Sequence, residues 1–428
     1  MNYEETAKRN SFWKGFLAGA LSVGAFLTLV FVICISTVGS IKVLSVKNNT
    51  SSSSSGNKAN GQTPDPLITG RVVDSNTAKK IDEIYSIIDR EFLFQENIDM
   101  DKMHDSIYRA VLSSLDDKYT EYYSPEELEN LLSDSSGVYY GVGSYVTMDT
   151  EKNLPYFSGV FEGSPAMTAG IRDGDYIYKV NGEEVMGLTL DEVVTKVKGP
   201  KGSTVDITIL RGDETLEITV TRDEVESPTV TYEMKEDKVG YIQIQQFDTV
   251  TSGQFEEAYK ALNEQGMKSL VIDLRSNPGG NLDTVLNICG QILPKGVITY
   301  TIDVNGNRED YNNNHDNRIQ IPLAVLVNEY SASASELMTG AIKDYGVGTI
   351  IGTTTFGKGI VQSIRMLSDG SGMKFTTNRY YTPNGVCIHG EGITPDKIVE
   401  FDSESYYAEE SFDNQLDYAI KYLTGQTN

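Results

Sequence analysis

Three closely spaced serines and one lysine are the residues of this chain best suited to nucleophilic chemistry. Ser331, Ser333 and Ser335 follow a short apolar segment and come just before a segment with helical spacing. Lys358 stands between two glycines, which leave room for a substrate or another backbone to approach. A serine at a helix N-terminus meets backbone N–H groups and the positive end of the helix dipole, which both stabilise an oxyanion. The pattern is typical of a serine nucleophile with a lysine base.

A lysine base imposes a condition on its surroundings. Lys358 can accept a proton near neutral pH only if burial lowers its pKa by about 3 units. Phe356, Ile360 and the nearby apolar strands are candidates for that burial. A strand over 359–365 would place Gln362 on the same face as Lys358, where its amide can hold the amine. We therefore expect activity to rise toward mildly alkaline pH.

Two other interpretations of these residues are weaker. Segment 352–359 fits a phosphate-binding loop except at its last position, where Gly359 replaces the Ser or Thr that ligates magnesium. A histidine base would have to be His104, His315 or His389, the only histidines of the chain. Because His, Cys, Asp and Glu form no cluster with metal-ligand spacing, we expect neither a metal nor a cofactor.

A second candidate oxyanion element ends an apolar strand at Asp273. The turn that follows contains Asn-Pro and Gly-Gly pairs, and its N–H groups at Gly279 and Gly280 would supply half of an oxyanion hole. The alternative is a plain strand-ending turn, because both pairs are common in turns. The residues alone leave both interpretations open.

A glycine loop in the middle of the chain resembles the carboxylate-binding loop of a PDZ domain. Tyr140, Gly141, Val142 and Gly143 precede an expected strand, and Ala-Gly-Ile, Gly-Asp and Asn-Gly sequences follow within 169–182. In such a loop, successive N–H groups bind a terminal carboxylate while the peptide adds to the sheet as a strand. This segment predicts a domain that binds protein C-termini.

The N-terminal region has the composition of a membrane anchor and a tether. Residues 15–41 contain no charged side chain and are long enough to cross a ~30 Å hydrocarbon core, so we expect an uncleaved signal anchor. Residues 48–66 are rich in Ser, Asn and Gly and cannot bury apolar surface. We expect a single-pass protein of the cell membrane with its folded part outside the cytoplasm.

The overall charge and the cysteines exclude other classes. A formal net charge of −25 argues against nucleic-acid partners, since phosphate binding needs a basic stripe. The three cysteines lack metal-ligand spacing, and a disulfide framework is not expected.

Together these features resemble the carboxyl-terminal processing peptidases, also called tail-specific proteases. The resemblance covers residues from about 79 to 423 and rests on the following segments: 115–120, the PDZ-like segment, 273–280, the serine run 331–335, 356–362, 381–385 and 392–396. It implies Ser333 as nucleophile, 25 residues before Lys358 as base, with Gln362 orienting the lysine. It also implies an oxyanion hole made by the N–H of Ala334 and a glycine of the Gly279-Gly280 turn.

The implied protein is an α/β and α+β multidomain enzyme that acts on unfolded or extended proteins with free C-termini and can form a homodimer. A membrane-tethered PDZ scaffold with an inert core is the alternative, against which the intact Ser333, Lys358 and Gln362 argue. The expected order is a cytoplasmic N-terminus over 1–14, a transmembrane anchor over 15–41, a Ser-rich linker over 42–76, a helical segment over 77–135, a PDZ domain over 136–223, a mixed α/β protease core over 224–400 and a tail helix over 401–428.

Overall fold

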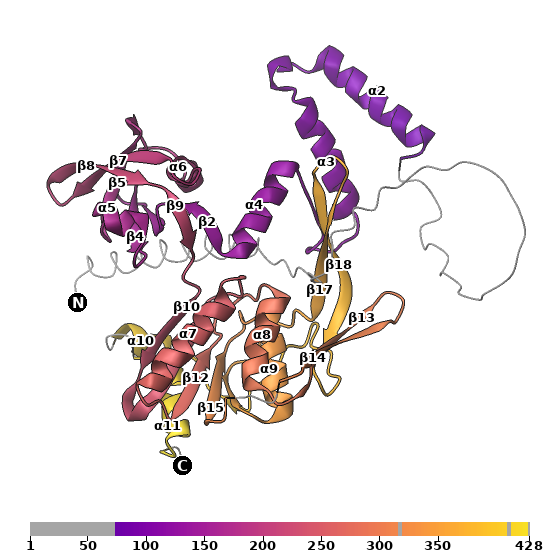
Figure 1. The fold of residues 1–428 in the computed structure, drawn as a ribbon. Helices are drawn as coiled ribbons and strands as arrows, with labels where there is room; N and C mark the ends of the chain where they lie inside the picture. Colours follow the sequence, from indigo (N-terminus) through magenta and orange to yellow (C-terminus); the bar gives the residue numbers. More distant parts are fainter. Residues whose placement is uncertain (1–72, 316–318, 409–411, 427–428) are drawn as a thin grey trace, which may run out of the picture.

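The computed structural model describes residues 73–315, 319–408 and 412–426. Figure 1 shows three parts: an α/β unit that contains most of the second half of the chain, a smaller β-rich unit, and an N-terminal group of helices. The anchor expected over 15–41 lies outside the described residues. Among the residues that are described, no helix is both long and apolar enough to cross a membrane.

A six-stranded sheet forms the centre of the α/β unit, in the order β10-β11-β12-β15-β16-β19. Strand β10 is antiparallel to β11, and the other neighbours are parallel. The parallel strands are short apolar runs because helices cover both faces of such a sheet. The strands run over Val230–Met234 (β10), Val239–Ile244 (β11), Ser269–Asp273 (β12), Leu323–Val327 (β15), Thr349–Gly352 (β16) and Lys397–Ile398 (β19), with a 3₁₀ turn over Glu236–Lys238 between the first two.

Helices on the two faces of this sheet bury alternate side chains of each strand. On one face, Ile272 and Val325 join the core of helices α7 (Thr251–Glu264), α8 (Leu282–Ile292) and α9 (Ala334–Tyr345). On the other face, Val271 and Leu326 pack with helix α11 (Asn414–Leu423). The expected α/β character is therefore observed.

The expected single tail helix over 401–428 is instead two helices among the described residues. Helix α10 spans Ser403–Ala408, and α11 begins after Asp413. The Asp413 carboxylate accepts the N–H groups of Gln415 and Leu416, so it caps the start of a separate helix.

A second, antiparallel sheet extends from the α/β unit, with the order β1-β18-β13-β14 and with β17 paired to β18. Its strands run over Glu121–Tyr123 (β1), Gly296–Asp303 (β13), Arg308–Asn313 (β14), Ile360–Met366 (β17) and Gly372–Tyr381 (β18). Strand β1 corrects the expectation that 77–135 is wholly helical. Its three residues are too few to show a period in sequence, and pairing of Glu121 with Lys374 and of Tyr123 with Gly372 defines the strand.

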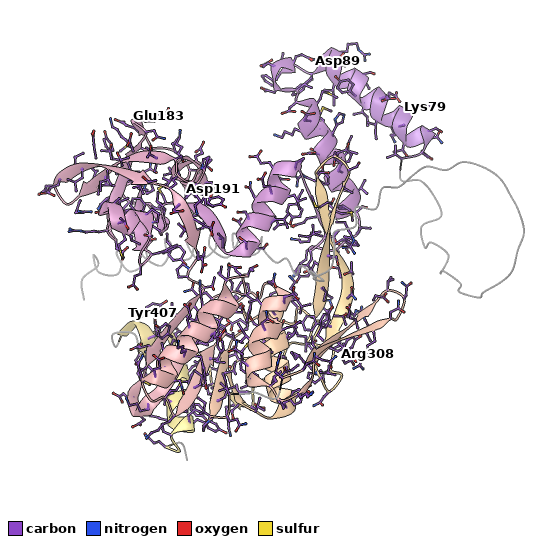
Figure 2. All side chains as sticks on the ribbon, viewed as in Figure 1. Lys79, Asp89, Glu183, Asp191, Arg308 and Tyr407 are labelled. Atoms are coloured by element: carbon purple, nitrogen blue, oxygen red, sulfur yellow. The ribbon has the colours of Figure 1, made fainter. Side chains whose placement is uncertain are left out.

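The N-terminal helices are α2 (Ser75–Glu91), α3 (Met100–Ser113) and α4 (Pro125–Ser136), with a 3₁₀ turn over Gln95–Asn97. Helix α4 begins with a capping box between Ser124 and Glu127, as Ser-Pro-Glu-Glu predicts. Helices α2 and α3 form a hairpin that projects from the rest, with Lys79 and Asp89 on α2 (Figure 2). Several apolar side chains on this hairpin are exposed, Ile84 and Phe92 among them.

The β-rich unit contains a six-stranded sheet and a two-stranded pair around its own apolar core. Its elements are β2 (Val138–Gly141), β3 (Ser144–Asp149), β4 (Leu154–Val160), α5 (Pro165–Ala169), β5 (Tyr176–Val180), β6 (Glu183–Glu184), α6 (Leu190–Val197), β7 (Thr204–Arg211), β8 (Glu214–Thr221) and β9 (Asp223–Glu226). Because β9 pairs with β2, the unit extends to residue 226, slightly past the expected boundary at 223.

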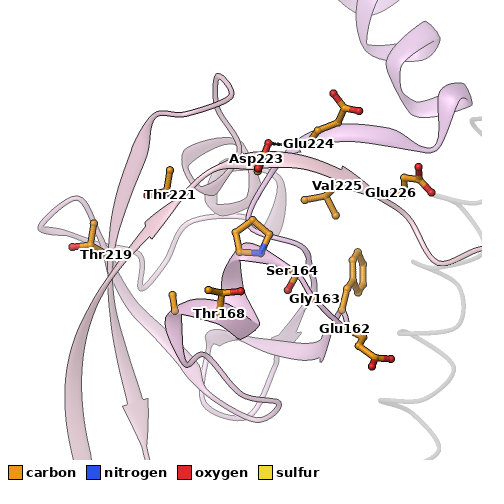
Figure 3. Close-up of a pocket in the computed structure, with 13 residues that line it drawn as sticks. Glu162, Gly163, Ser164, Thr168, Thr219, Thr221, Asp223, Glu224, Val225 and Glu226 are labelled. Atoms are coloured by element: carbon orange, nitrogen blue, oxygen red, sulfur yellow. Dashed lines mark hydrogen bonds between the residues drawn. The ribbon is translucent and has the colours of Figure 1, made fainter.

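This unit has a hollow of about 590 Å³ between α5 and strands β8 and β9 (Figure 3). Glu162, Asp223, Glu224 and Glu226 are among the residues that line it. None of residues 140–143 lines this hollow, so it is distinct from the predicted carboxylate-binding loop.

Candidate active site

Ser333 occupies a strained turn between strand β15 and helix α9. Its backbone has φ 56° and ψ −113°, a conformation that costs a non-glycine residue about 1–3 kcal/mol. The residue is 1% exposed, and its hydroxyl has no hydrogen-bond partner among the described residues. An unpaired buried hydroxyl is itself costly. Strain and an unsatisfied hydroxyl at one residue point to a functional role for Ser333.

The two neighbouring serines have structural partners. Ser331 Oγ donates to Leu274 O at 2.8 Å, and Ser335 Oγ donates to Asn277 O at 2.9 Å. Both hydroxyls therefore fasten the serine loop to the turn that follows β12. Within the run, Ser333 is left with the hydroxyl suited to attack a substrate.

Glu336 joins the turn of the serine to the turn of the lysine. Its carboxylate is fully buried and accepts four hydrogen bonds. Oε2 accepts the N–H groups of Ser333 at 2.9 Å and Lys358 at 2.7 Å. Oε1 accepts the N–H of Gly357 at 2.6 Å and the hydroxyl of Thr355 at 2.7 Å. Burial raises the pKa of this carboxyl, although the four donors act in the opposite direction. One oxygen atom thus bridges the backbones of the two predicted catalytic residues.

Lys358 is 2% exposed, as a lysine base requires. Burial lowers the pKa of its side chain to about 7, and the positive charges of Lys374 and Lys118 act in the same direction. The carboxylates of Glu336 and Asp117 oppose this shift. At neutral pH a substantial fraction of Lys358 is therefore the neutral amine that can accept a proton.

Gln362 is buried in strand β17, and its carbonyl Oε1 has no hydrogen-bond partner among the described residues. The strand begins at Ile360, after Lys358, and its register shifts between Val361 and Gln362, so the two residues do not lie on one regular strand as expected. Its amide nitrogen lies 3.5 Å from Thr376 Oγ1, which donates to Asp117 at 2.7 Å. The ring of Tyr119 lies 4.5 Å from Lys358 Nζ. The segment before β1 thus completes the surroundings of the lysine.

The predicted oxyanion donors lie beside Ser333. A Cβ atom added to Gly279 would lie 2.8 Å from Ser333 Cβ and 3.0 Å from Ala334 N, so the two loops are in close contact. The N–H of Gly279, however, already donates to Asn277 Oδ1 at 2.8 Å. Gly280 is therefore the remaining glycine candidate of this turn, with Ala334 at the start of α9.

The structure also bears on the two competing interpretations. Lys358 is followed by strand β17, whereas a phosphate-binding loop requires a helix there. The side chains of His104, His315 and His389 are all exposed, and none forms a described contact with Ser333.

The predicted carboxylate-binding loop opens toward the α/β unit. Tyr140 and Gly141 end strand β2, and Gly143 has φ +80°. Val142 lines a cavity of about 430 Å³. The remaining lining includes Tyr145, Val146, Val194, Val197 and Lys198 of the β-rich unit and Gln246, Asp248 and Pro278 of the α/β unit. Since Pro278 directly precedes Gly279, this cavity runs from the loop to the turn beside Ser333.

Sequence reasoning assigned no role to the residues that surround the predicted catalytic ones, although segment 115–120 contributed to the resemblance. In the sequence, Glu336 is simply the residue that follows the serine run. A pattern of apolar spacing cannot show that a carboxylate is buried, so its role was not predicted. Asp117 and Tyr119 lie more than 200 residues before Lys358, so their proximity depends on the pairing of β1 with β18.

Comparison with known proteins supports a protease core and a PDZ domain. Residues 238–399 match peptidase family S41, and residues 156–211 match the PDZ domain. A "Probable CtpA-like serine protease" of Staphylococcus aureus (strain COL) is 35% identical over 330 residues, which is 76% of this chain and 66% of that protein. A protein of the same name from Staphylococcus saprophyticus is 35% identical over 75% of this chain and 65% of its own length. The chain thus spans slightly less than two thirds of these relatives.

Among solved structures, a photosystem II D1 C-terminal processing protease is 30% identical. The match covers 77% of this chain and 94% of that chain, with a TM-score of 0.43.

Replacing Glu336 with Gln should disconnect the two turns. The amide of Gln presents N–H groups where two of the four donors now point, so at least two hydrogen bonds become repulsive. We expect the rate of peptide hydrolysis to fall about 10- to 100-fold, because a misplacement of reacting groups by about 1 Å can cost about 100-fold, while circular dichroism stays native. Glu329→Gln, an exposed site nearby, is the matched control. Equal activity of the two variants would contradict a bridging role for Glu336.

The depressed pKa of Lys358 has a consequence for stability. An unfolded lysine stays protonated up to about pH 10.4, whereas folded Lys358 releases its proton near pH 7, so folding is penalised most at or below pH 7 and the penalty shrinks as pH rises. Lys358→Met should therefore stabilise the protein more at pH 7 than at pH 9, with a difference of about 1–3 kcal/mol. Chemical denaturation at the two pH values measures it. A pH-independent difference would show that Lys358 titrates normally.

Proposed function

Because the chain belongs to peptidase family S41, we propose that it is a membrane-anchored serine endopeptidase that recognises the C-terminal region of protein substrates through its PDZ domain. In this proposal Ser333 and Lys358 form the catalytic dyad and Gln362 orients the lysine. One observation carries it: the backbone N–H groups of Ser333 and Lys358 donate to the same carboxylate oxygen of Glu336. Ser333 is strained and buried and has an unpaired hydroxyl, and the pKa of the buried Lys358 side chain is about 7.

Acylation begins when the neutral amine of Lys358 takes the hydroxyl proton of Ser333. The Ser333 oxygen forms a bond to the carbonyl carbon of the peptide, and the carbonyl oxygen becomes an oxyanion. The N–H groups of Ala334 and Gly280 would stabilise that charge, at about 3–4 kcal/mol per donor. When the tetrahedral intermediate collapses, the C–N bond breaks and the Lys358 ammonium gives its proton to the leaving amine.

Deacylation repeats these steps with water in place of the serine hydroxyl. Lys358, neutral again, takes a proton from a water molecule, whose oxygen adds to the acyl carbon. Collapse then breaks the bond to Ser333, and the lysine returns the proton to the serine oxygen. Burial of the site favours the neutral amine between turnovers.

Substrate capture is assigned to the cavity beside the PDZ loop. Its apolar residues Val142, Val146, Val194 and Val197 suit an apolar C-terminal side chain, and the strand β3 offers an edge for an extended peptide. The backbone of residues 140–143 would bind the terminal carboxylate. The same cavity reaches Pro278, so a captured tail would lie close to the proposed oxyanion turn.

The proposal includes anchoring and assembly. The uncharged segment 15–41 supports a single-pass anchor with the catalytic domain outside the cytoplasm. The exposed apolar side chains of α2 and α3 support a homodimer formed through this hairpin.

Substituting either dyad residue should abolish cleavage. We expect full-length Ser333→Ala and Lys358→Ala to lose at least about 1000-fold in rate on an unfolded protein with an apolar C-terminus. Amidation of that C-terminus should weaken cleavage by the wild type, because the PDZ loop loses its charged ligand. Gel analysis of product formation provides the measurement, with Lys421→Ala as an exposed control.

The outcomes separate the two candidate functions. Equal cleavage by all variants would mean that the dyad is wrongly assigned. Binding of the free tail without cleavage by the wild type would favour the inert PDZ scaffold.

Deletion of residues 15–41 should release the protein from the membrane. We expect the full chain to remain in the membrane pellet after alkaline carbonate extraction and to sediment as a dimer in detergent, whereas the deletion variant should appear in the supernatant. A full chain that is extracted by carbonate would rule out a transmembrane anchor.

A further inference from the structure

A second lysine is buried near the proposed base. Lys374 lies in strand β18 and is 5% exposed. Its Nζ donates to Glu121 Oε2 at 2.8 Å and to the hydroxyl of Tyr123 at 2.7 Å, both from strand β1. A lysine is rarely buried this far unless it is paired, and the pairing makes the burial tolerable. It does not by itself explain why a positive charge lies at this place.

Strand register places Lys374 on the face of the sheet that carries Gln362. In the pairing of β17 with β18, Gln362 lies opposite Thr376 and Ile364 lies opposite Lys374. Side chains of opposed residues point to the same face, as do those two positions apart on one strand. Thr376 contacts the amide of Gln362. Lys374 is two residues before Thr376 on the same strand, and its side chain therefore lies next to that of Thr376 on the same face.

The segment preceding and forming β1 contacts both lysines in turn. Tyr119 lies against Lys358 Nζ at 4.5 Å, and Glu121, two residues later, binds Lys374. A turn at Tyr119 and the start of β1 at Glu121 therefore reach the two amines from one short segment. The charge of Lys374 therefore acts on Lys358.

We propose that Lys374 is a positioning residue for the reaction, which acts through its positive charge to keep Lys358 in the neutral, proton-accepting form. The inference rests on the proposed function of Ser333 and Lys358. Two ammonium groups repel each other, so a fixed charge on Lys374 disfavours protonation of Lys358. Glu121 and Tyr123 hold Lys374 in place.

Other charged groups, on separate elements, also act on Lys358. Asp117, before β1, and Glu336, on α9, favour the protonated form, and Lys118 disfavours it. After burial itself, Lys374 has the largest effect of any charge on the pKa of Lys358. Lys118 is exposed, so solvent and salt screen its charge more strongly than that of Lys374.

The partners of Lys374 leave its charge only partly compensated. The Glu121 side chain is 41% exposed, so water shields its negative charge. The hydroxyl of Tyr123 donates a hydrogen bond to the carboxylate of Glu121. Burial raises the pKa of Tyr123 well above its ordinary value, and the phenol therefore remains neutral. The charge of Glu127 raises the pKa of Tyr123, and the charge of Arg109 lowers it.

The test is the pH profile of the full-length protein in detergent. Lys374→Met should raise the apparent pKa of the acidic limb by about one unit. The rate at pH 7 should then fall about fivefold, because the neutral fraction of the base falls from about one half to about one tenth. At pH 9 the rates should agree within about a factor of two. Lys374→Arg, which keeps the charge, should retain the wild-type profile, as should the remote control Lys421→Met.

Other results would overturn the inference. A loss of equal size at pH 7 and pH 9 would identify Lys374 as a purely structural residue. Glu121→Gln provides a test that does not depend on the stability of Lys374→Met. Removing the anion leaves the Lys374 charge less compensated, so the acidic limb should shift to lower pH, and a shift to higher pH would contradict the proposal.

A second readout separates this inference from the proposed function. Titration of the Lys358 amine by ¹⁵N NMR in Ser333→Ala protein, with and without Lys374→Met, measures the base directly. An upward shift of the Lys358 pKa without catalytic activity in the wild type would support the charge effect and reject the peptidase. An active wild type with no shift on substitution of Lys374 would support the peptidase and reject the role of Lys374.

Discussion

The candidate site depends on the hydrogen bonds that the buried carboxylate of Glu336 accepts. This carboxylate accepts four donors, and these come from both loops that must meet: the serine turn at the start of α9 and the segment 355–358. A fully buried carboxylate is tolerable only when its oxygens are satisfied. The positions of the donors are therefore constrained together, and the strained backbone of Ser333 is held by the same acceptor that holds the backbone of Lys358.

The parallel sheet brings these loops to one edge. The turn with Gly279 follows β12, the serine loop follows β15, and the lysine segment follows β16. These strands are neighbours in the order β12-β15-β16, so all three loops leave the carboxyl ends of adjacent parallel strands. Ligands of open α/β sheets bind at this edge. Because both faces of the sheet are buried by helices, the polar residues of the candidate site lie in the loops at the ends of its strands.

The sequence predicts the local structure well where the signal is local. The apolar strand expected to end at Asp273 is β12, and the segment with helical spacing after the serine run is α9. The Ser-Pro-Glu-Glu sequence caps the start of α4. The family is likewise confirmed. What could not be predicted depends on distant pairing. Strand β1 has no periodic signal of its own, and the contacts of Asp117, Tyr119 and Glu121 exist only because β18 lies beside it. The partner of Gly279 was also hidden, since nothing in a Gly-Gly pair shows which N–H an asparagine side chain will occupy.

The pairing of β1 with β18 has a consequence for the order in which the molecule matures. The bond between Lys374 and Glu121 spans 253 residues, and the contact of Thr376 with Asp117 spans 259. Contacts of such separation form late, because closing a long loop costs entropy before any local contact offsets it. A chain emerging from the ribosome can complete its β-rich unit and much of its central sheet while the surroundings of Lys358 remain unassembled. The surroundings of Lys358 therefore cannot be complete before synthesis has passed residue 376.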